Sequence, residues 1–185
     1  MDNGSNSYRR YCEGDEKGLV EIIKEYKDGL VIYLNGYVDN LIIAEELVED
    51  TFVYIGIKKP RDKGKSSFKT WLYTIARNIT IDYLRKNTKR REICIDECEK
   101  ISNEEDEIEL SVIRDENRII VHRALKKMNP QYRQVLLLAY FEEFSNREIS
   151  KIMKKSIHSI ETLVYRARKS LKEQLEKEGF YYEKL

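Results

Sequence analysis

Residues 145–171 read SNREISKIMKKSIHSIETLVYRARKSL, and this stretch contains two helix patterns separated by a short turn. Apolar residues recur at spacings of three and four on both sides of the turn, as expected for two amphipathic helices that cross. Ser145 and Ser156 stand where each helix begins, and Glu148 completes a capping-box pattern with Ser145. The stretch predicts a helix-turn-helix whose second helix enters the major groove of DNA.

The remainder of the chain also favours helices, and no alternating run supports a sheet. Pro60 limits the second predicted helix, and Asn129-Pro130 separates the two helices that precede the helix-turn-helix. The predicted helices cover residues 15–35, 41–58, 67–91, 119–128, 131–141, 145–153 and 157–178. The predicted fold is all-α.

Charge is distributed in three blocks behind a formal net charge of +1. Residues 61–91 contain ten Lys or Arg against two Asp, and residues 145–177 contain nine basic residues against four acidic ones. Between these blocks, residues 92–116 contain eleven acidic residues against two basic ones, and the hydrophobicity of this stretch is low. This pattern predicts two small helical domains that face polyanions, joined by a flexible acidic linker.

Composition argues against several other classes of protein. Apolar runs are far shorter than the ~20 residues that span a bilayer, and the first residues are polar, so we expect a cytoplasmic protein without membrane insertion. Phosphate-binding glycine loops and nucleophile elbows are missing, so we expect no catalytic residue and no cofactor. Cys94 and Cys98 could contribute to a metal site with His122, but zinc needs about four ligands, so we expect none.

Three motifs resemble those of one known family. Residues 148–171 look like the DNA-binding motif of region 4 of sigma factors, including the Glu148-Ile149 opening and the Arg-Ala-Arg triplet at 166–168. Residues 44–55, AEELVEDTFVYI, resemble the polymerase-binding helix of region 2, and residues 67–86 resemble the promoter-opening helix that follows it. The order of the motifs, with no third domain between them, is similar to the extracytoplasmic-function (ECF) class of the sigma-70 family.

The resemblance implies both an organisation and a function. The implied segments are a flexible N-terminus (1–14), region 2 (15–90), an acidic linker (91–112), region 4 (113–178) and a C-terminal tail (179–185). A sigma factor binds core RNA polymerase and directs transcription initiation at a specific set of genes, without being an enzyme. The implied partners are the largest-subunit coiled coil and the flap of core RNA polymerase, promoter DNA and an anti-sigma factor.

The family pattern also implies three sets of site residues. The residues expected to bind polymerase are Glu45, Glu46, Leu47, Glu49, Asp50 and Phe52. The residues expected to open and read the promoter's minus-ten element are Lys63, Lys65, Trp71, Tyr73, Arg77, Asn78, Arg85 and Lys86, and the loop over 58–67 matches the place where this class captures a flipped base. The residues expected to read the minus-thirty-five element are Lys154, Lys155, His158, Ser159, Glu161, Thr162, Tyr165, Arg166, Arg168 and Lys169.

Departures from the family pattern leave alternatives open. Glu161 and Leu163 stand where this class usually has Lys and Arg, so Glu161 either accepts from a cytosine amino group or faces solvent. Lys154 replaces the usual turn glycine. A second hypothesis is a stand-alone helix-turn-helix regulator that dimerises through its N-terminal half and binds palindromic sites. A third, an enzyme acting on nucleic acid, requires clustered carboxylates or a metal.

Overall fold

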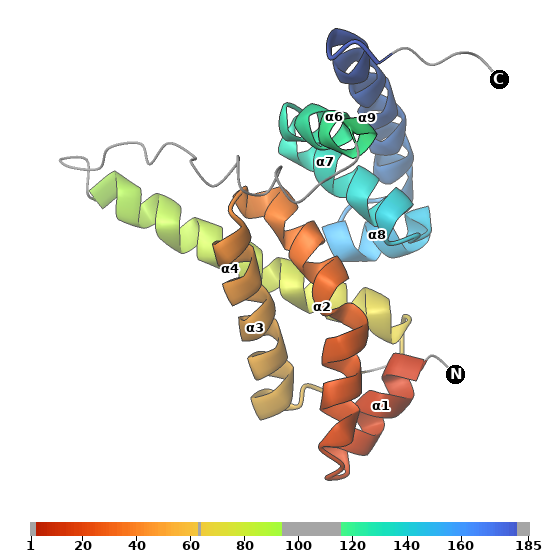
Figure 1. The fold of residues 1–185 in the computed structure, drawn as a ribbon. Coiled ribbons are helices and arrows are strands. Elements are labelled where there is room, and N and C mark those ends of the chain that lie inside the picture. The colour runs from red at the N-terminus through yellow and green to blue at the C-terminus, as the bar shows by residue number, and fades with distance from the viewer. Residues whose placement is uncertain (1–2, 63, 94–115, 181–185) are drawn as a thin grey trace.

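A computed structural model describes residues 3–62, 64–93 and 116–180, and over these ranges it contains helices and no strand (Figure 1). The elements in chain order are α1 (Asn3–Cys12), α2 (Lys17–Val38), α3 (Leu41–Lys58), α4 (Phe68–Ile93), α6 (Glu116–Lys126), α7 (Pro130–Leu136), the π-helical turn η1 (Leu137–Phe141), α8 (Asn146–Met153) and α9 (Ile157–Lys177). We call α1 to α4 the N-terminal half and α6 to α9 the C-terminal half. The all-α prediction is confirmed.

Helix boundaries follow the capping residues in the sequence. The Asn40 side chain accepts a hydrogen bond from the Ile43 N–H at 2.9 Å and so begins α3, while Lys59 ends it in a left-handed conformation. Ser67 caps α4 by accepting from the Thr70 N–H at 3.3 Å. Pro130 occupies the first turn of α7, where its missing N–H costs no hydrogen bond.

The N-terminus differs from the sequence-based expectation. Residues 1–14 were predicted to be flexible, but Asn3–Cys12 forms α1, which packs on α2 and α4. The segment has no long apolar stripe that would predict a helix. It packs on the core through two aromatic residues, Tyr8 and Tyr11, which stand among polar neighbours. The predicted linker begins at residue 91, whereas α4 continues to Ile93; residues 94–115 lie outside the described part of the chain.

The two halves differ in the type of side chain that fills their interiors. Tyr26, Phe68 and Tyr33 are buried in the N-terminal half, with Phe68 5.7 Å from Tyr26 between ring centroids. Aliphatic side chains such as Ile152 and Ile160 fill the C-terminal half and are fully buried. Among the described residues, no helix combines the length and the apolar character needed to cross a membrane.

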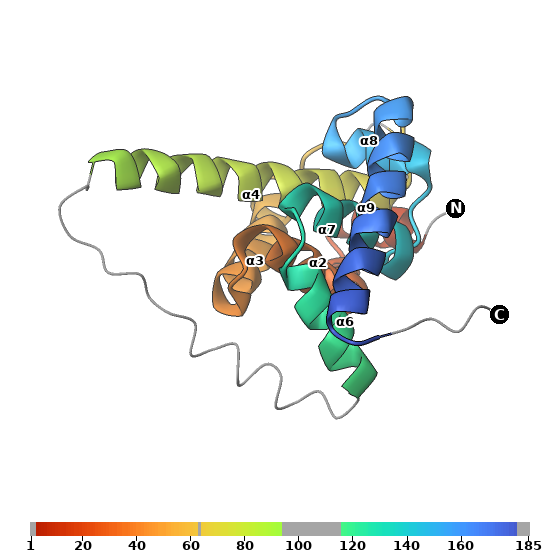
Figure 2. The same cartoon turned by 90° about the horizontal axis from the view of Figure 1, so that it is seen from above.

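The halves pack directly on each other, and one cluster of buried residues continues through both. Figures 1 and 2 show α8 beside the N-terminal end of α4, whose C-terminal end extends beyond the other helices. The α7–η1 segment lies against α2, where Gly36 allows close approach: a Cβ there would stand 2.9 Å from a Leu137 methyl carbon. Arg133 reinforces the contact by an ion pair with Asp39 at 3.2 Å.

Candidate nucleic-acid interface

Helices α8 and α9 form the predicted helix-turn-helix. Ser145 Oγ accepts from the Glu148 N–H at 3.3 Å, and Glu148 accepts from the Ser145 N–H at 3.0 Å, so the predicted capping box is confirmed. Ser156 caps α9 by accepting from the Ser159 N–H at 3.1 Å. Lys154, at the position of the usual turn glycine, adopts a left-handed conformation with φ 55°. The motif closes despite the backbone strain of a non-glycine residue there.

The exposed side of α9 carries most of the residues expected to read the minus-thirty-five element. His158 exposes 92% of its side chain and Tyr165 exposes 72% of its surface. Lys154, Lys155, Ser159, Glu161, Arg166, Arg168 and Lys169 are also exposed. Thr162 differs because it is half-buried and its hydroxyl donates to the His158 carbonyl at 3.0 Å. Helix α9 therefore presents a continuous polar and mainly basic face to solvent.

The residues expected to read the minus-ten element are less accessible. Tyr73, expected among the residues that read the minus-ten element, is buried, so DNA cannot reach its side chain in the described arrangement. Trp71 is half-buried, with its ring 5.1 Å from that of Tyr8 and 5.3 Å from that of Phe68. Asn78 is also half-buried. The aromatic side chains of α4 are therefore mostly packed within the protein.

Three of the cationic residues expected to contact the minus-ten element lie on α4 and differ in exposure. Arg77 is half-buried. Burial raises the pKa of Tyr33 and Tyr37, and the positive charge of Arg77 partly offsets this increase. By contrast, Arg85 and Lys86 are exposed near the end of α4 that extends beyond the other helices (Figure 2). Arg85 lies 3.7 Å from the Asp82 carboxylate, and both exposed cations can reach phosphates in the described arrangement.

Tyr73 is covered by the C-terminal half. Its ring contacts that of Phe144 edge-on, with centroids 5.1 Å apart. Burial, followed by the nearby Glu142 carboxylate, raises the pKa of the Tyr73 hydroxyl. Lys69 reaches across the same contact and pairs with Glu142 at 2.8 Å.

Glu148 links the capping box of α8 to the start of α4. Its carboxylate accepts from the Thr70 hydroxyl at 3.0 Å and from the Ser67 hydroxyl at 3.1 Å. Burial acts to raise the pKa of Glu148, but hydrogen bonds from Ser145, Thr70 and Ser67 outweigh it and hold that pKa below its ordinary value. The helical periodicity of the sequence does not predict these contacts, because they join residues about 80 positions apart in the chain.

The α3–α4 loop, residues 59–62 and 64–67, adjoins this contact. Lys65 is exposed, and its carbonyl accepts from the Lys151 ammonium of α8 at 2.7 Å. Lys63, which was expected to contact the minus-ten element, lies outside the described residues. The loop therefore lies beside both α4 and the first helix of the helix-turn-helix.

Helix α3 presents a second candidate surface. Glu45, Glu46, Glu49 and Asp50 are exposed, as expected for a face that meets a basic partner. Leu47 and Phe52 were also expected to meet that partner, but their side chains are 2% and 7% exposed and pack in the core of the described structure. Five apolar residues outside the predicted set are also exposed on α3: Leu41, Ile42, Val53, Tyr54 and Ile57. Acidic and apolar side chains on one exposed helix favour a protein partner.

The described residues show no cluster of three His, Cys, Asp or Glu side chains able to hold a metal ion. Cys94 and Cys98, considered as ligands from the sequence, lie outside those residues. His122 lines a cavity of about 150 Å³ between α2 and the α6–α7 segment, together with Asp39 and Arg133. The described residues around His122 belong to both halves and do not form a set of metal ligands.

Comparison with known proteins agrees with the division of the chain into an N-terminal and a C-terminal half. Residues 22–90 match the family "Sigma-70 region 2", and residues 118–171 match "Sigma-70, region 4". The RNA polymerase sigma factor YlaC of Bacillus subtilis (strain 168) is 30% identical over 160 residues, which cover 86% of this chain and 92% of that protein. The ECF RNA polymerase sigma factor SigW of the same organism is 26% identical over 174 residues, which cover 88% of this chain and 91% of that protein.

A solved structure also has the same fold. It is the co-crystal structure of the sigma factor RpoE in complex with the anti-sigma factor NepR from Bartonella quintana. The superposition has a TM-score of 0.70 at 22% sequence identity and covers 86% of this chain and 98% of the matched one.

Proposed function

The chain belongs to the sigma-70 family of RNA polymerase sigma factors, in the ECF class, and we propose how its two halves divide the work of promoter recognition. A sigma factor of this kind directs transcription initiation at particular promoters and is not an enzyme. In our proposal residues 15–90 act as region 2, which binds core RNA polymerase and opens and reads the minus-ten element. Residues 113–178 act as region 4, which reads the minus-thirty-five element.

The observation that carries the proposal is the exposed basic face of α9 within a capped helix-turn-helix. Arg166, Arg168 and Lys169 lie where cations can meet phosphates, while His158 and Glu161 lie near the N-terminal end that enters the major groove. Glu161 exposes 56% of its side chain, so its carboxylate can accept from a cytosine amino group there. We assign base reading to the first two turns of α9 and phosphate contact to the later ones.

The minus-ten role of α4 requires that the halves separate. In the described arrangement Phe144 and Glu148 cover Tyr73 and Thr70, so a melted strand cannot reach those side chains. Withdrawal of α8 would expose an aromatic ring and the hydroxyls of Ser67 and Thr70 beside Lys69. Single-stranded bases stack on aromatic rings with about 1 to 3 kcal/mol per base, so the uncovered face suits an unpaired strand.

Core polymerase provides a physical reason for that separation. We propose that the exposed side of α3 binds the coiled coil of the largest polymerase subunit, with Glu45, Glu46, Glu49 and Asp50 facing its basic residues and Ile57 adding apolar contact. We further propose that the flap holds the C-terminal half at a distance set by the promoter. Two DNA-reading modules gain avidity only when their spacing matches the two elements.

The remaining partners follow from the same proposal. We place the protein in the cytoplasm because core polymerase and promoter DNA are there. The Bartonella quintana structure pairs its sigma factor with an anti-sigma factor, and we propose a partner of that kind for this chain as well. Such a partner would act by stabilising the arrangement in which α4 is covered.

The proposal is tested by run-off transcription with purified core polymerase and a library of bacterial promoters, with and without the protein, alongside co-elution. We expect new promoter-dependent transcripts and co-elution with core polymerase. Glu49→Lys, a charge reversal on α3, should reduce co-elution, while Glu173→Lys at the exposed outer part of α9 serves as the matched reversal. Absence of both transcripts and co-elution would instead favour a stand-alone helix-turn-helix regulator.

A further inference from the structure

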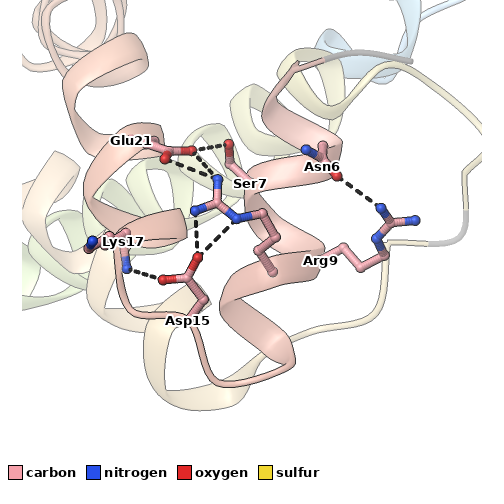
Figure 3. A network of polar contacts seen from close by, with 7 residues as sticks. Asn6, Ser7, Arg9, Asp15, Lys17 and Glu21 are labelled. Carbon is pink, nitrogen blue, oxygen red and sulfur yellow. Dashed lines mark hydrogen bonds and ion pairs between the residues drawn. The ribbon is translucent and has the colours of Figure 1, made fainter.

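Helix α1 is firmly attached to α2. The Arg10 guanidinium bonds two carboxylates that Figure 3 labels, Asp15 and Glu21: its Nε donates to Asp15 at 2.9 Å and its Nη1 to Glu21 at 3.0 Å. The Ser7 hydroxyl also donates to Glu21, at 2.6 Å. Gly18 permits the close approach of the two helices, because a Cβ there would overlap the Ser7 carbonyl oxygen.

Two tyrosines extend from α1 to the opposite side, toward the α3–α4 loop. The Tyr8 hydroxyl donates to the Pro60 carbonyl at 2.8 Å, and the Tyr11 hydroxyl donates to the Gly56 carbonyl at 2.9 Å. The Lys59 ammonium lies over the Tyr11 ring, 4.6 Å from its centroid. Thus α1 holds the end of α3 and the first residues of the loop by hydrogen bonds to backbone carbonyls.

Tyr8 also connects the loop to the start of α4. Its ring lies 5.5 Å from that of Phe68 and 5.1 Å from that of Trp71. Burial, followed by the nearby Cys12, raises the pKa of the Tyr8 hydroxyl, so that hydroxyl stays protonated and able to donate. A single α1 side chain therefore contacts both ends of the segment that leads into α4.

The loop has few other supports once the halves separate. Lys59 and Gly64 both have positive φ, at 41° and 64°, so the loop turns sharply twice. Within the loop, the Gly64 N–H donates to the Asp62 side chain at 2.9 Å. The bond from Lys151 to the Lys65 carbonyl comes from α8 and is lost when the C-terminal half withdraws. The contacts from Tyr8 and Tyr11 lie within the N-terminal half and persist.

We infer that α1 holds the α3–α4 loop in the shape that receives the unpaired base of the minus-ten element, with Tyr8 and Tyr11 as positioning residues. This inference rests on the proposed role of that loop in capturing a base. Neither tyrosine contacts DNA; Tyr8 acts through the loop backbone at Pro60, and Tyr11 acts through the last turn of α3 at Gly56. The ligand is a nucleobase extruded from the promoter strand, and α1 lowers the cost of ordering the loop around it.

The test uses holoenzyme assembled from the full chain and core polymerase, with a promoter obtained from the run-off assay. Forked promoter DNA carries 2-aminopurine at successive minus-ten positions, so that its fluorescence reports an extruded base. Tyr8→Phe and Tyr11→Phe each remove one hydroxyl and keep the ring. We expect each to weaken binding of the base-containing fork about threefold, as the loss of one hydrogen bond predicts, and the double variant more.

Two controls separate positioning from general damage. Tyr132→Phe removes the hydroxyl of a half-buried tyrosine in the C-terminal half and should leave fork binding unchanged. On a fork that is abasic at the extruded position, the difference between wild type and the Tyr8 and Tyr11 variants should disappear. A deficit that persists on the abasic fork, or variants equal to wild type on the intact fork, would overturn the inference.

The proposed function fails in a different way. If wild-type holoenzyme extrudes no base at any minus-ten position, the loop is not a base-capture site, and the inference falls with that role. If wild type extrudes the base and the variants do so equally, only the role of α1 is wrong.

Discussion

The two candidate DNA-reading helices of the protein differ in how complete they are. Helix α9 exposes its basic residues and rests on a capped, buried turn, so its reading face is already formed. The start of α4 has Tyr73 and Thr70 buried beneath the C-terminal half, so its reading face becomes available only when that half moves. If the protein reads DNA as proposed, polymerase binding must change the access to α4 much more than the access to α9.

The largest effect expected from this comparison is on stability. Tyr73→Ala leaves a cavity under both halves and should lower the free energy of unfolding by about 3 to 5 kcal/mol. Tyr165→Ala removes a ring that is 72% exposed and should change that free energy by less than about 0.5 kcal/mol. Urea denaturation of both variants measures the contrast. Equal losses would contradict the assignment of Tyr73 to a buried contact.

The next effect concerns the Glu148 carboxylate, which joins α8 to the start of α4. Glu148→Gln keeps an acceptor for the capping box but weakens the bonds from Ser67 and Thr70, so the closed arrangement should lose about 1 to 2 kcal/mol. We expect faster amide hydrogen exchange over residues 67–73. Glu143→Gln, an exposed neighbour without these contacts, is the matched control. Unchanged exchange in Glu148→Gln would remove this residue from the contact.

The same carboxylate predicts a dependence on pH. Its pKa is lowered when the halves are closed, so its stabilising effect is complete above the ordinary value of 4.5 and is lost as the pH falls through the lowered pKa. Exchange over residues 67–73 should therefore increase at acidic pH in the wild type. In Glu148→Gln this acidic increase should be smaller, and an identical profile would show that other groups control it.

A smaller effect is expected at α9, the exposed DNA-reading helix. Arg168→Ala removes one phosphate contact, so the slope of log affinity against log salt should decrease by about one for minus-thirty-five DNA bound to holoenzyme. Lys177→Ala removes an equal charge at the far end of α9 and should leave the slope unchanged. Fluorescence anisotropy at several salt concentrations measures both. An equal change in the two variants would indicate only a general effect of charge.

The smallest effect concerns the turn between α8 and α9. Lys154 has φ 55°, so Lys154→Gly should relieve backbone strain and raise the free energy of unfolding by about 0.5 to 1 kcal/mol. Lys155→Gly, next to it but without a positive φ, should instead be neutral or destabilising. Thermal unfolding of the two variants compares them directly, and a loss of stability in Lys154→Gly would contradict the strain argument.

Sequence reasoning succeeded where the structure depends on local chemistry. The caps of α8 and α9 were predicted because Ser145, Glu148 and Ser156 act on backbone groups only three residues away or fewer. The exposure of α9 was predicted for the same reason, since its apolar stripe occupies only one face of the helix.

Its errors arose where distant segments decide the outcome. Tyr73 was expected to contact DNA because residues 67–86 resemble the promoter-opening helix, but Phe144 of the other half covers it. Helix α1 was missed because Tyr8 and Tyr11 gain their packing from α3, α4 and the loop between them. Leu47 and Phe52 were expected to bind polymerase because residues 44–55 resemble the polymerase-binding helix, but the structure buries both side chains.

The most direct test of the account is a distance across the contact between the halves. Glu25 of α2 and Glu143 of the η1–α8 turn line the same open groove, and each can be replaced by a spin-labelled cysteine after Cys12, Cys94 and Cys98 are changed to Ser. We predict one short distance in the free protein and a clearly longer one in transcriptionally active holoenzyme. The short distance persisting in active holoenzyme would contradict the account, because α4 would then read DNA while covered.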